Sequence, residues 1–217
     1  NRQGQLLTQG TYLNGQKTGK WIWWQDKNTK DIEGELENGM RTGLWKFYYP
    51  DGKVEYQGSY KDDLRHGKWQ YHYPNGKIWK SGNYENGQKQ GEWNYWSEDG
   101  TLVMQGAFDK GKEQGTWKSW YDSGAEKSVG EFNQGQMHGM WEGKFMDTKP
   151  NFKGRYNNGL KDGNWKHWFP NGKMELEENY AQGMLNGTRR SWFENGQLKD
   201  EGLFEDNKRV GSWNYFY

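Results

Sequence analysis

Glycine returns every 24 residues along this chain, and that period constrains the fold more than any other feature. The uninterrupted series is Gly19, Gly43, Gly67, Gly91, Gly115, Gly139, Gly163, Gly187 and Gly211. A tryptophan stands two residues after each member except at Arg189. A second glycine series precedes the first by nine residues and is broken once, at Glu178. Self-similarity at a short fixed period indicates a repeat architecture, so we expect one array of nine 24-residue units over residues 1–217, with no separate domain.

Each unit contains two candidate strands. In the third unit these are about residues 54–60 and 68–73, with a loop over 61–67 between them and Pro74-Asn75-Gly76 after them. Pro-Asn-Gly suits a type I turn that closes on a left-handed glycine. The pattern predicts an all-β protein, an elongated, β-solenoid-like single-sheet array of antiparallel β-hairpin repeats with roughly eighteen short strands.

Composition excludes several classes of protein. Only 31% of the 217 residues are hydrophobic, whereas 18% are aromatic, which argues against an α/β enzyme core rich in aliphatic side chains. No apolar run approaches the roughly 18 residues of a membrane-spanning helix. The 30 basic and 29 acidic residues are interspersed, so the basic stripe of a nucleic-acid binder is missing. Without cysteine there is no thiolate nucleophile and no Cys-based zinc site.

Alternation along the strands assigns the tryptophan series to one dry face. The same reasoning places Val54 on that face, together with Gly58 and Tyr60. If Tyr60 pairs with Gly67 across the hairpin loop, Gly58 stands opposite Trp69, whose indole then covers the glycine.

The two exceptions to the glycine and tryptophan series fall in one unit, at Glu178 and Arg189. In the register just described these positions are paired across the hairpin. We therefore expect Glu178 and Arg189 to be cross-strand neighbours, with carboxylate and guanidinium within about 6 Å. If the pair is exposed, it should contribute little to stability.

The opposite face has a mostly polar background that is crossed by one line of rings and interrupted at Lys144. We call the following positions the aromatic line: Trp24, Tyr48, His72, Trp96, Trp120, Trp168 and Trp192. Its members should recur every ~9–10 Å, which is two strand spacings. Aromatic side chains of this kind form recognition surfaces for proteins or sugars. The alternative is that the rings stack on one another and stabilise a thin sheet.

No constellation of catalytic or metal-binding residues stands out. His66 and His138 share a repeat position but lie three units apart, so one chain cannot bring them to a common metal. Paired acidic residues fall in loops or on the polar face, and no two carboxylates face each other in a recognisable pocket. We expect no enzyme activity, no metal and no cofactor. In the sixth unit, the irregular stretch 143–150 predicts a bulge or kink.

Hairpins of this kind resemble the variant MORN repeats, in particular the bacterial branch labelled the YwqK-like antitoxin family. The likeness rests on stretches such as Asn75-Gly76-Lys77, Gly82-Asn83-Tyr84 and Gly91-Glu92-Trp93 and extends over the whole chain. It implies a hairpin array without catalytic residues that binds a protein partner, such as a toxin, or serves as a general scaffold. The classical MORN unit implies lipid contact, but this sequence has no basic cluster to meet anionic headgroups, so membrane contact is not expected.

The leading functional hypothesis is a non-catalytic protein-binding scaffold, antitoxin-like or part of a cell-envelope complex. One alternative is a carbohydrate- or cell-wall-binding aromatic array. Another is an accessory repeat region of a larger protein whose enzyme domain lies outside these residues. The compartment is open, with the bacterial cell envelope or secretion favoured over the cytoplasm.

Overall fold

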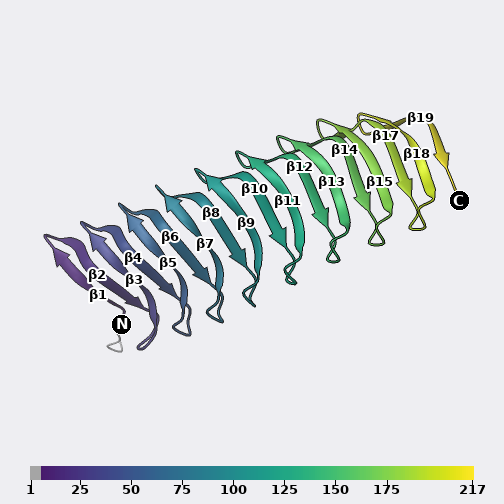
Figure 1. Ribbon diagram of the computed structural model, residues 1–217. Coiled ribbons are helices and arrows are strands. Elements are labelled where there is room, and N and C mark those ends of the chain that lie inside the picture. The colour runs from purple at the N-terminus through teal and green to yellow at the C-terminus, as the bar shows by residue number, and fades with distance from the viewer. Residues whose placement is uncertain (1–5) are drawn as a thin grey trace. The chain divides into compact units, whose positions relative to one another are not determined.

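The computed structural model describes residues 6–217, and these form one antiparallel sheet of consecutive hairpins with nineteen strands and no helix (Figure 1). Each strand pairs with its neighbours in sequence. The count exceeds the predicted eighteen because one strand is interrupted at Asn186, which leaves β16 and β17 both paired with β15. The predicted all-β hairpin array is therefore confirmed.

The chain divides into two compact units, which are described separately. The first is Asn1–Leu102 with Ala107–Lys112, and the second is Val103–Gly106 with Glu113–Tyr217. The strands up to the division are β1 (Thr8–Leu13), β2 (Gln16–Trp24), β3 (Lys30–Glu37), β4 (Met40–Tyr48), β5 (Val54–Lys61), β6 (Leu64–His72), β7 (Ile78–Glu85), β8 (Gln88–Trp96) and β9 (Leu102–Asp109). Those after it are β10 (Lys112–Trp120), β11 (Glu126–Asn133), β12 (Gln136–Lys144), β13 (Pro150–Asn157), β14 (Leu160–Trp168), β15 (Met174–Ala181), β16 (Met184–Leu185), β17 (Gly187–Trp192), β18 (Leu198–Glu205) and β19 (Lys208–Tyr215).

The first turn of each repeat is tighter than the sequence suggested. In the third repeat β5 ends at Lys61 and β6 begins at Leu64, so only Asp62 and Asp63 form the loop. Both have positive φ, 51° and 65°, as a type I′ hairpin turn requires. The prediction of a loop over 61–67 was wrong because this turn needs two residues and the rest continue the ladder.

The register inside the hairpin also differs from the predicted one. Tyr60 pairs with Arg65 and not with Gly67, yet Gly58 still faces Trp69. A register shift between Gly58 and Ser59 reconciles the two pairings. Gly67, at a φ of 66°, adopts the left-handed conformation that such a bulge needs. The predicted glycine–tryptophan pair is thus confirmed, although the premise that led to it was wrong.

A column of tryptophans over glycines forms the core. Trp69 stands opposite Gly58 in its own hairpin and opposite Gly82 in the next, and it is fully buried. A Cβ at Gly58 would overlap the indole ring, so no other residue fits there. The indole N–H of Trp69 donates to the carbonyl of Ser59 at 3.1 Å. The other buried members of the column are Trp21, Trp45, Trp93, Trp117, Trp141 and Trp165.

A second set of rings packs edge-on against this column. Tyr60 meets Trp69 at a centroid distance of 5.1 Å and an interplanar angle of 89°. Phe132 meets Trp141 in the same way, at 5.2 Å and 88°. Edge-to-face contact of this kind is the favoured geometry of aromatic pairs, so the dry face is held by ring packing in place of aliphatic side chains.

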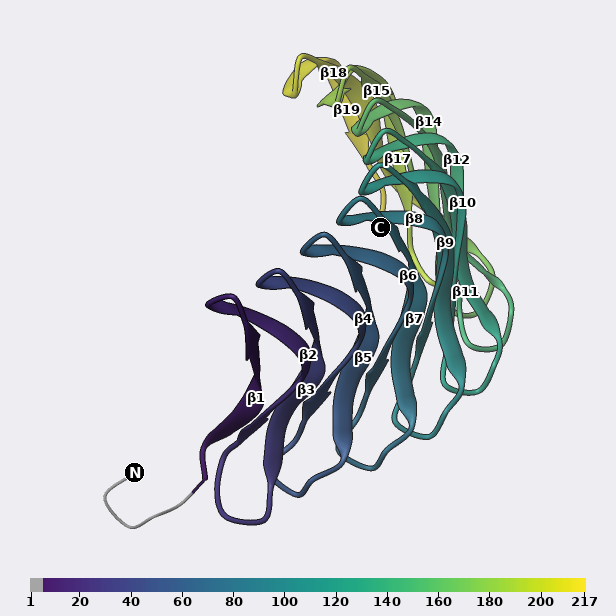
Figure 2. The ribbon, with the colours of Figure 1, turned by 90° about the vertical axis from the view of Figure 1, so that its left-hand side faces the viewer.

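The strands bend along their length (Figure 2), and a second bulge in each repeat changes which side chains share a face. Between β4 and β5, Phe47 pairs with Tyr56 and Tyr48 pairs with Val54, with a register shift between the pairs. Val54 therefore shares the face of Tyr48, and its predicted place on the dry face was wrong. The extra residue Glu55 reverses the alternation, which simple period-two counting cannot detect.

The bulge predicted over 143–150 is present as a register shift between Gly143 and Lys144, but the same shift occurs in other repeats, so it is not specific to the sixth repeat. Phe145 accepts a hydrogen bond from the N–H of Thr148 at 2.9 Å, as equivalent residues do in other repeats, and Thr148 holds the left-handed turn position at a φ of 70°. The ring of Phe152 occupies the space above Gly143, so the missing aromatic residue is compensated from the next strand.

Repeats are joined by side-chain hydrogen bonds as well as by the ladder. The hydroxyl of Tyr49 donates to the carbonyl of His72 at 2.7 Å, that of Tyr73 to Trp96 at 2.8 Å and that of Tyr121 to Lys144 at 2.8 Å. At the turns, the ammonium groups of Lys53 and Lys77 donate to backbone carbonyls one repeat further on. These side chains thus anchor their repeats to the backbone of the next one.

Candidate functional site

Every member of the aromatic line is the last residue of its strand. Trp24, Tyr48, His72 and Trp96 end β2, β4, β6 and β8 in the first unit. In the second unit, Trp120, Trp168 and Trp192 end β10, β14 and β17. All seven are half-buried. The line therefore keeps part of each ring on the surface at a fixed place in the repeat.

Aliphatic side chains from the following strands lie beside four rings of the line. Tyr48 pairs with Val54, His72 with Ile78, Trp168 with Met174 and Trp192 with Leu198. Cross-strand partners share a face, so rings and aliphatic groups alternate. Within residues 6–217 no ring of the line contacts another ring of the line. Four of the rings thus have aliphatic partners, whereas Trp24 pairs with Lys30 and Trp120 with Glu126, and self-stacking does not account for the line.

A buried carboxylate fixes the start of the line. The hydroxyl of Tyr48 donates to Glu33, whose other oxygen lies 2.8 Å from the ammonium of Lys30 and 3.3 Å from that of Lys20. Burial opposes ionisation of Glu33, but the hydrogen bonds from Lys30, Tyr48 and Lys20 outweigh it and lower its pKa to about 2. Burial, together with the bond to Glu33, raises the pKa of Tyr48. The side chain of Tyr48 is therefore held in one orientation by its bond to Glu33.

The break in the line at Lys144 is an ion pair. The ammonium of Lys144 lies 2.8 Å from a carboxylate oxygen of Glu126, which pairs with Trp120. The hydrogen bond to Glu126 raises the pKa of Lys144. In the second unit the apolar part of the line therefore consists of Trp168, Met174, Trp192 and Leu198, and charge interrupts the line before Trp168.

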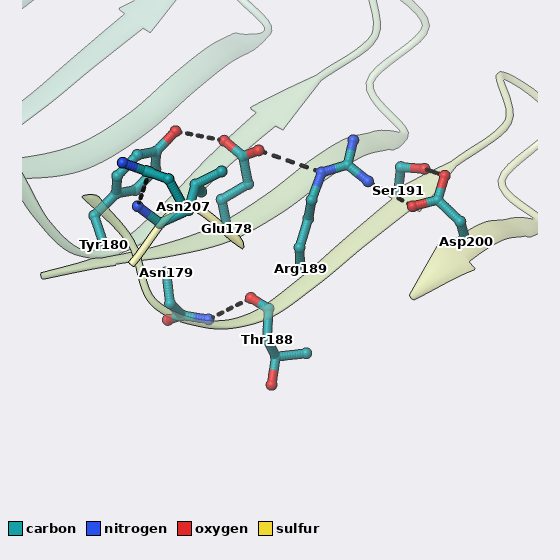
Figure 3. A network of polar contacts seen from close by, with 9 residues as sticks. Glu178, Asn179, Tyr180, Thr188, Arg189, Ser191, Asp200 and Asn207 are labelled. Carbon is teal, nitrogen blue, oxygen red and sulfur yellow. Dashed lines mark hydrogen bonds and ion pairs between the residues drawn. The ribbon is translucent and has the colours of Figure 1, made fainter. Parts of the chain in front are cut away.

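The second predicted contact, between Glu178 and Arg189, is present in the structure (Figure 3). The Nε of Arg189 lies 3.4 Å from Oε1 of Glu178. Arg189 also forms an ion pair with Asp200, whose other oxygen accepts a hydrogen bond from the hydroxyl of Ser191. The hydroxyl of Tyr180 donates to Glu178 at 2.8 Å.

This network is buried, whereas the sequence reasoning considered an exposed pair. Glu178, Asp200 and Ser191 are each 8% exposed. Asp200 was missed because its repeat position holds apolar residues in several other units, among them Tyr56 and Leu176. One arginine bridging two carboxylates leaves few polar atoms unsatisfied, so the network replaces the indole and is not an open ligand site.

A further group of residues escaped the sequence reasoning. Trp79 is 42% exposed, whereas the other tryptophans of the described chain are buried or half-buried. Its neighbour Lys80 stands at a repeat position that carries a charge at only one other place, Asp200. A tryptophan outside the repeat's aromatic positions, beside an exceptional charge, was the signal that could have marked this place.

The described residues contain no group of three or more His, Asp or Glu side chains placed to hold a metal ion. Among the same residues, no helix is long and apolar enough to cross a membrane.

Four segments of the chain match the family model of the MORN repeat variant. They are residues 41–62, 65–88, 161–182 and 185–206. A comparison with curated proteins gives no match. The matched segments each span the second strand of one hairpin and the first strand of the next, as 41–62 covers most of β4 and β5. The resemblance to variant MORN repeats is thus confirmed at these four repeats. Such repeats are commonly modules that bind proteins or membranes.

Proposed function

We propose that this chain is a non-catalytic, protein-binding repeat module and that the aromatic line is its recognition surface. The observation that carries the proposal is the alternation of half-buried rings with Val54, Ile78, Met174 and Leu198 on an otherwise mostly polar face. Tryptophan and tyrosine anchors within an apolar strip that is rimmed by charge are typical of protein interfaces.

The same alternation favours a protein over a sugar as the partner. A sugar ring needs an open aromatic face and polar groups that converge on its hydroxyls. Here an aliphatic side chain flanks Tyr48, His72, Trp168 and Trp192, which suits an apolar patch on a partner protein. By its likeness to the antitoxin branch of the variant MORN repeats, the partner we propose is a toxin-like protein or a component of a bacterial cell-envelope complex.

The test compares two double variants on the same two strands. Trp168→Ala with Trp192→Ala removes two rings of the line. Lys166→Ala with Arg190→Ala removes two charges that lie two residues away on the same face. Each protein, once shown to be folded by circular dichroism, is used to capture partners from the native source, and captured proteins are quantified by mass spectrometry.

We expect a protein captured by the wild type to be lost at least about tenfold from the ring variant and retained by the charge variant. Equal capture by the wild type and the ring variant would refute the role of the line. Binding of the wild type to a glycan array, abolished in the ring variant, would favour the carbohydrate reading in its place.

A further inference from the structure

A cluster of cations lies on the dry face of the first unit, on the side of the sheet away from the aromatic line. The guanidinium of Arg65 lies 4.7 Å from the ring centroid of Trp69 and contacts the hydroxyl of Tyr71 at 3.3 Å. The ammonium of Lys80 lies 4.6 Å from the centroid of the same Tyr71 ring. One tyrosine therefore stands between two positive charges.

Two more residues complete the cluster. Lys80 lies 4.0 Å from the ring centroid of Trp79, the exposed tryptophan. On its other side Lys80 pairs with Tyr95, whose hydroxyl accepts a hydrogen bond from Lys89 at 3.3 Å. We call Arg65, Trp79, Lys80 and Lys89 the cationic patch.

The patch carries positive charge that the described chain does not neutralise at its centre. Within residues 6–217 no carboxylate lies within 4.0 Å of the charged nitrogens of Arg65 or Lys80. Burial lowers the pKa of Lys80, and the nearby charges of Lys89 and Arg65 lower it further. An anion placed between these groups would relieve both their repulsion and the cost of burying them.

The second unit shows what a neutralised cation on this face looks like. Arg189 lies between Glu178 and Asp200, and Asp200 occupies the repeat position that Lys80 holds in the first unit. The chain thus supplies its own carboxylates in one place and supplies none to Arg65 or Lys80 in the other. Because Lys80 has no cationic counterpart in any other repeat, the group of three cations around it is local, and the patch fits a short acidic segment and not an extended polyanion.

We propose that the cationic patch binds an acidic peptide segment of a partner protein. The carboxylates of the segment would meet Lys80 and Arg65 in charge-assisted hydrogen bonds, and one of its apolar side chains would pack on Trp79. This binding surface is separate from the aromatic line, so it can fail or succeed independently of the function proposed above.

The test uses a fluorescein-labelled hexapeptide of alternating Asp and Leu, and its Asn/Leu counterpart, in fluorescence anisotropy titrations. Lys80→Met removes the central charge and introduces the residue found one repeat later, at Met104. Lys161→Met is the matched control, because Lys161 lies 4.4 Å over Trp165 much as Lys89 lies over Trp93, but in a unit without a counterpart of Lys80.

We expect the Asp/Leu peptide to bind the wild type and the Lys161→Met variant alike. Lys80→Met should weaken that binding by about tenfold or more, the effect of losing a charge-assisted hydrogen bond. NMR of the lysine side chains should also show the pKa of Lys80 rising when the peptide is added. Three results would overturn the proposal: equal binding by Lys80→Met, equal binding of the Asn/Leu peptide, or binding of phosphatidylserine vesicles without binding of the peptide.

Discussion

The ion network around Arg189 can be replaced by the residues that other repeats have at these positions, which tests how tryptophan packing over glycine stabilises the core. The triple variant Glu178→Gly, Arg189→Trp, Asp200→Leu puts back the glycine, its covering indole and an apolar neighbour of the kind found at Leu176. Replacing a buried ion triad by packed apolar groups is typically neutral or stabilising by about 1–4 kcal/mol. We therefore expect the free energy of unfolding of this variant to match or exceed that of the wild type.

The single variant Arg189→Ala should behave in the opposite way. The side chains of Glu178 and Asp200 are only 11% and 12% exposed, and Arg189 is the cation within ion-pair distance of both. Its removal leaves two carboxylates buried without a partner charge, which costs about 3–5 kcal/mol. The single variant should therefore be less stable than the triple variant by about 3 kcal/mol or more.

Urea denaturation followed by far-UV circular dichroism measures both effects as shifts of the unfolding midpoint. The slope of the transition should stay constant, because the surface exposed on unfolding is nearly the same in all three proteins. A loss smaller than about 1 kcal/mol in Arg189→Ala would mean that the network behaves as an exposed pair. A triple variant less stable than Arg189→Ala would refute the tryptophan-over-glycine account of this unit.

Three further predictions concern other parts of the sheet. Trp165→Ala should lower the free energy of unfolding by about 3–5 kcal/mol, whereas Trp168→Ala, three residues away but half-buried, should cost clearly less; equal losses in thermal or urea melts would contradict the assignment of faces. Glu33 has a pKa of about 2 in the fold, so its stabilising effect, on the order of 1–3 kcal/mol, is fully present above the unfolded pKa near 4.5 and is lost as the pH falls toward 2. Glu33→Gln should make the free energy of unfolding less dependent on pH in that window, and an unchanged pH dependence would refute the shift. Thr148→Gly should raise the unfolding midpoint by the equivalent of about 1 kcal/mol, because a β-branched residue is strained at its φ of 70°; a lower midpoint would argue against that strain.

The hairpin array and its core could be predicted from the sequence because the period is uninterrupted and its two exceptions coincide. Glu178 and Arg189 revealed the glycine–tryptophan register even though the assumed partner of Tyr60 was wrong. The seven positions of the aromatic line followed from the repeat spacing alone. Its use in binding stays a prediction.

Bulges limited the rest of the prediction. A residue such as Glu55, inserted between Val54 and Tyr56, reverses the alternation of faces without leaving a sequence signal as strong as a glycine. Val54, the aliphatic partner of Tyr48 in the aromatic line, was therefore assigned to the wrong face. Asp200 and Lys80 were overlooked because a single charged residue inside an otherwise variable repeat position does not stand out until its neighbours in space are known.

The hydrogen bonds from tyrosine hydroxyls join neighbouring repeats through the backbone of the aromatic-line position and do not use its side chain. Tyr49, Tyr73 and Tyr121 donate to the main-chain oxygens of His72, Trp96 and Lys144. These three acceptors share one repeat position yet carry an imidazole, an indole and an ammonium group. Since the backbone carbonyl oxygen is present whatever the side chain, the residue at this position can be substituted without losing the hydrogen bond between repeats. The side chains of the line can therefore be substituted one at a time, which makes this position a starting point for engineering arrays with chosen binding specificity.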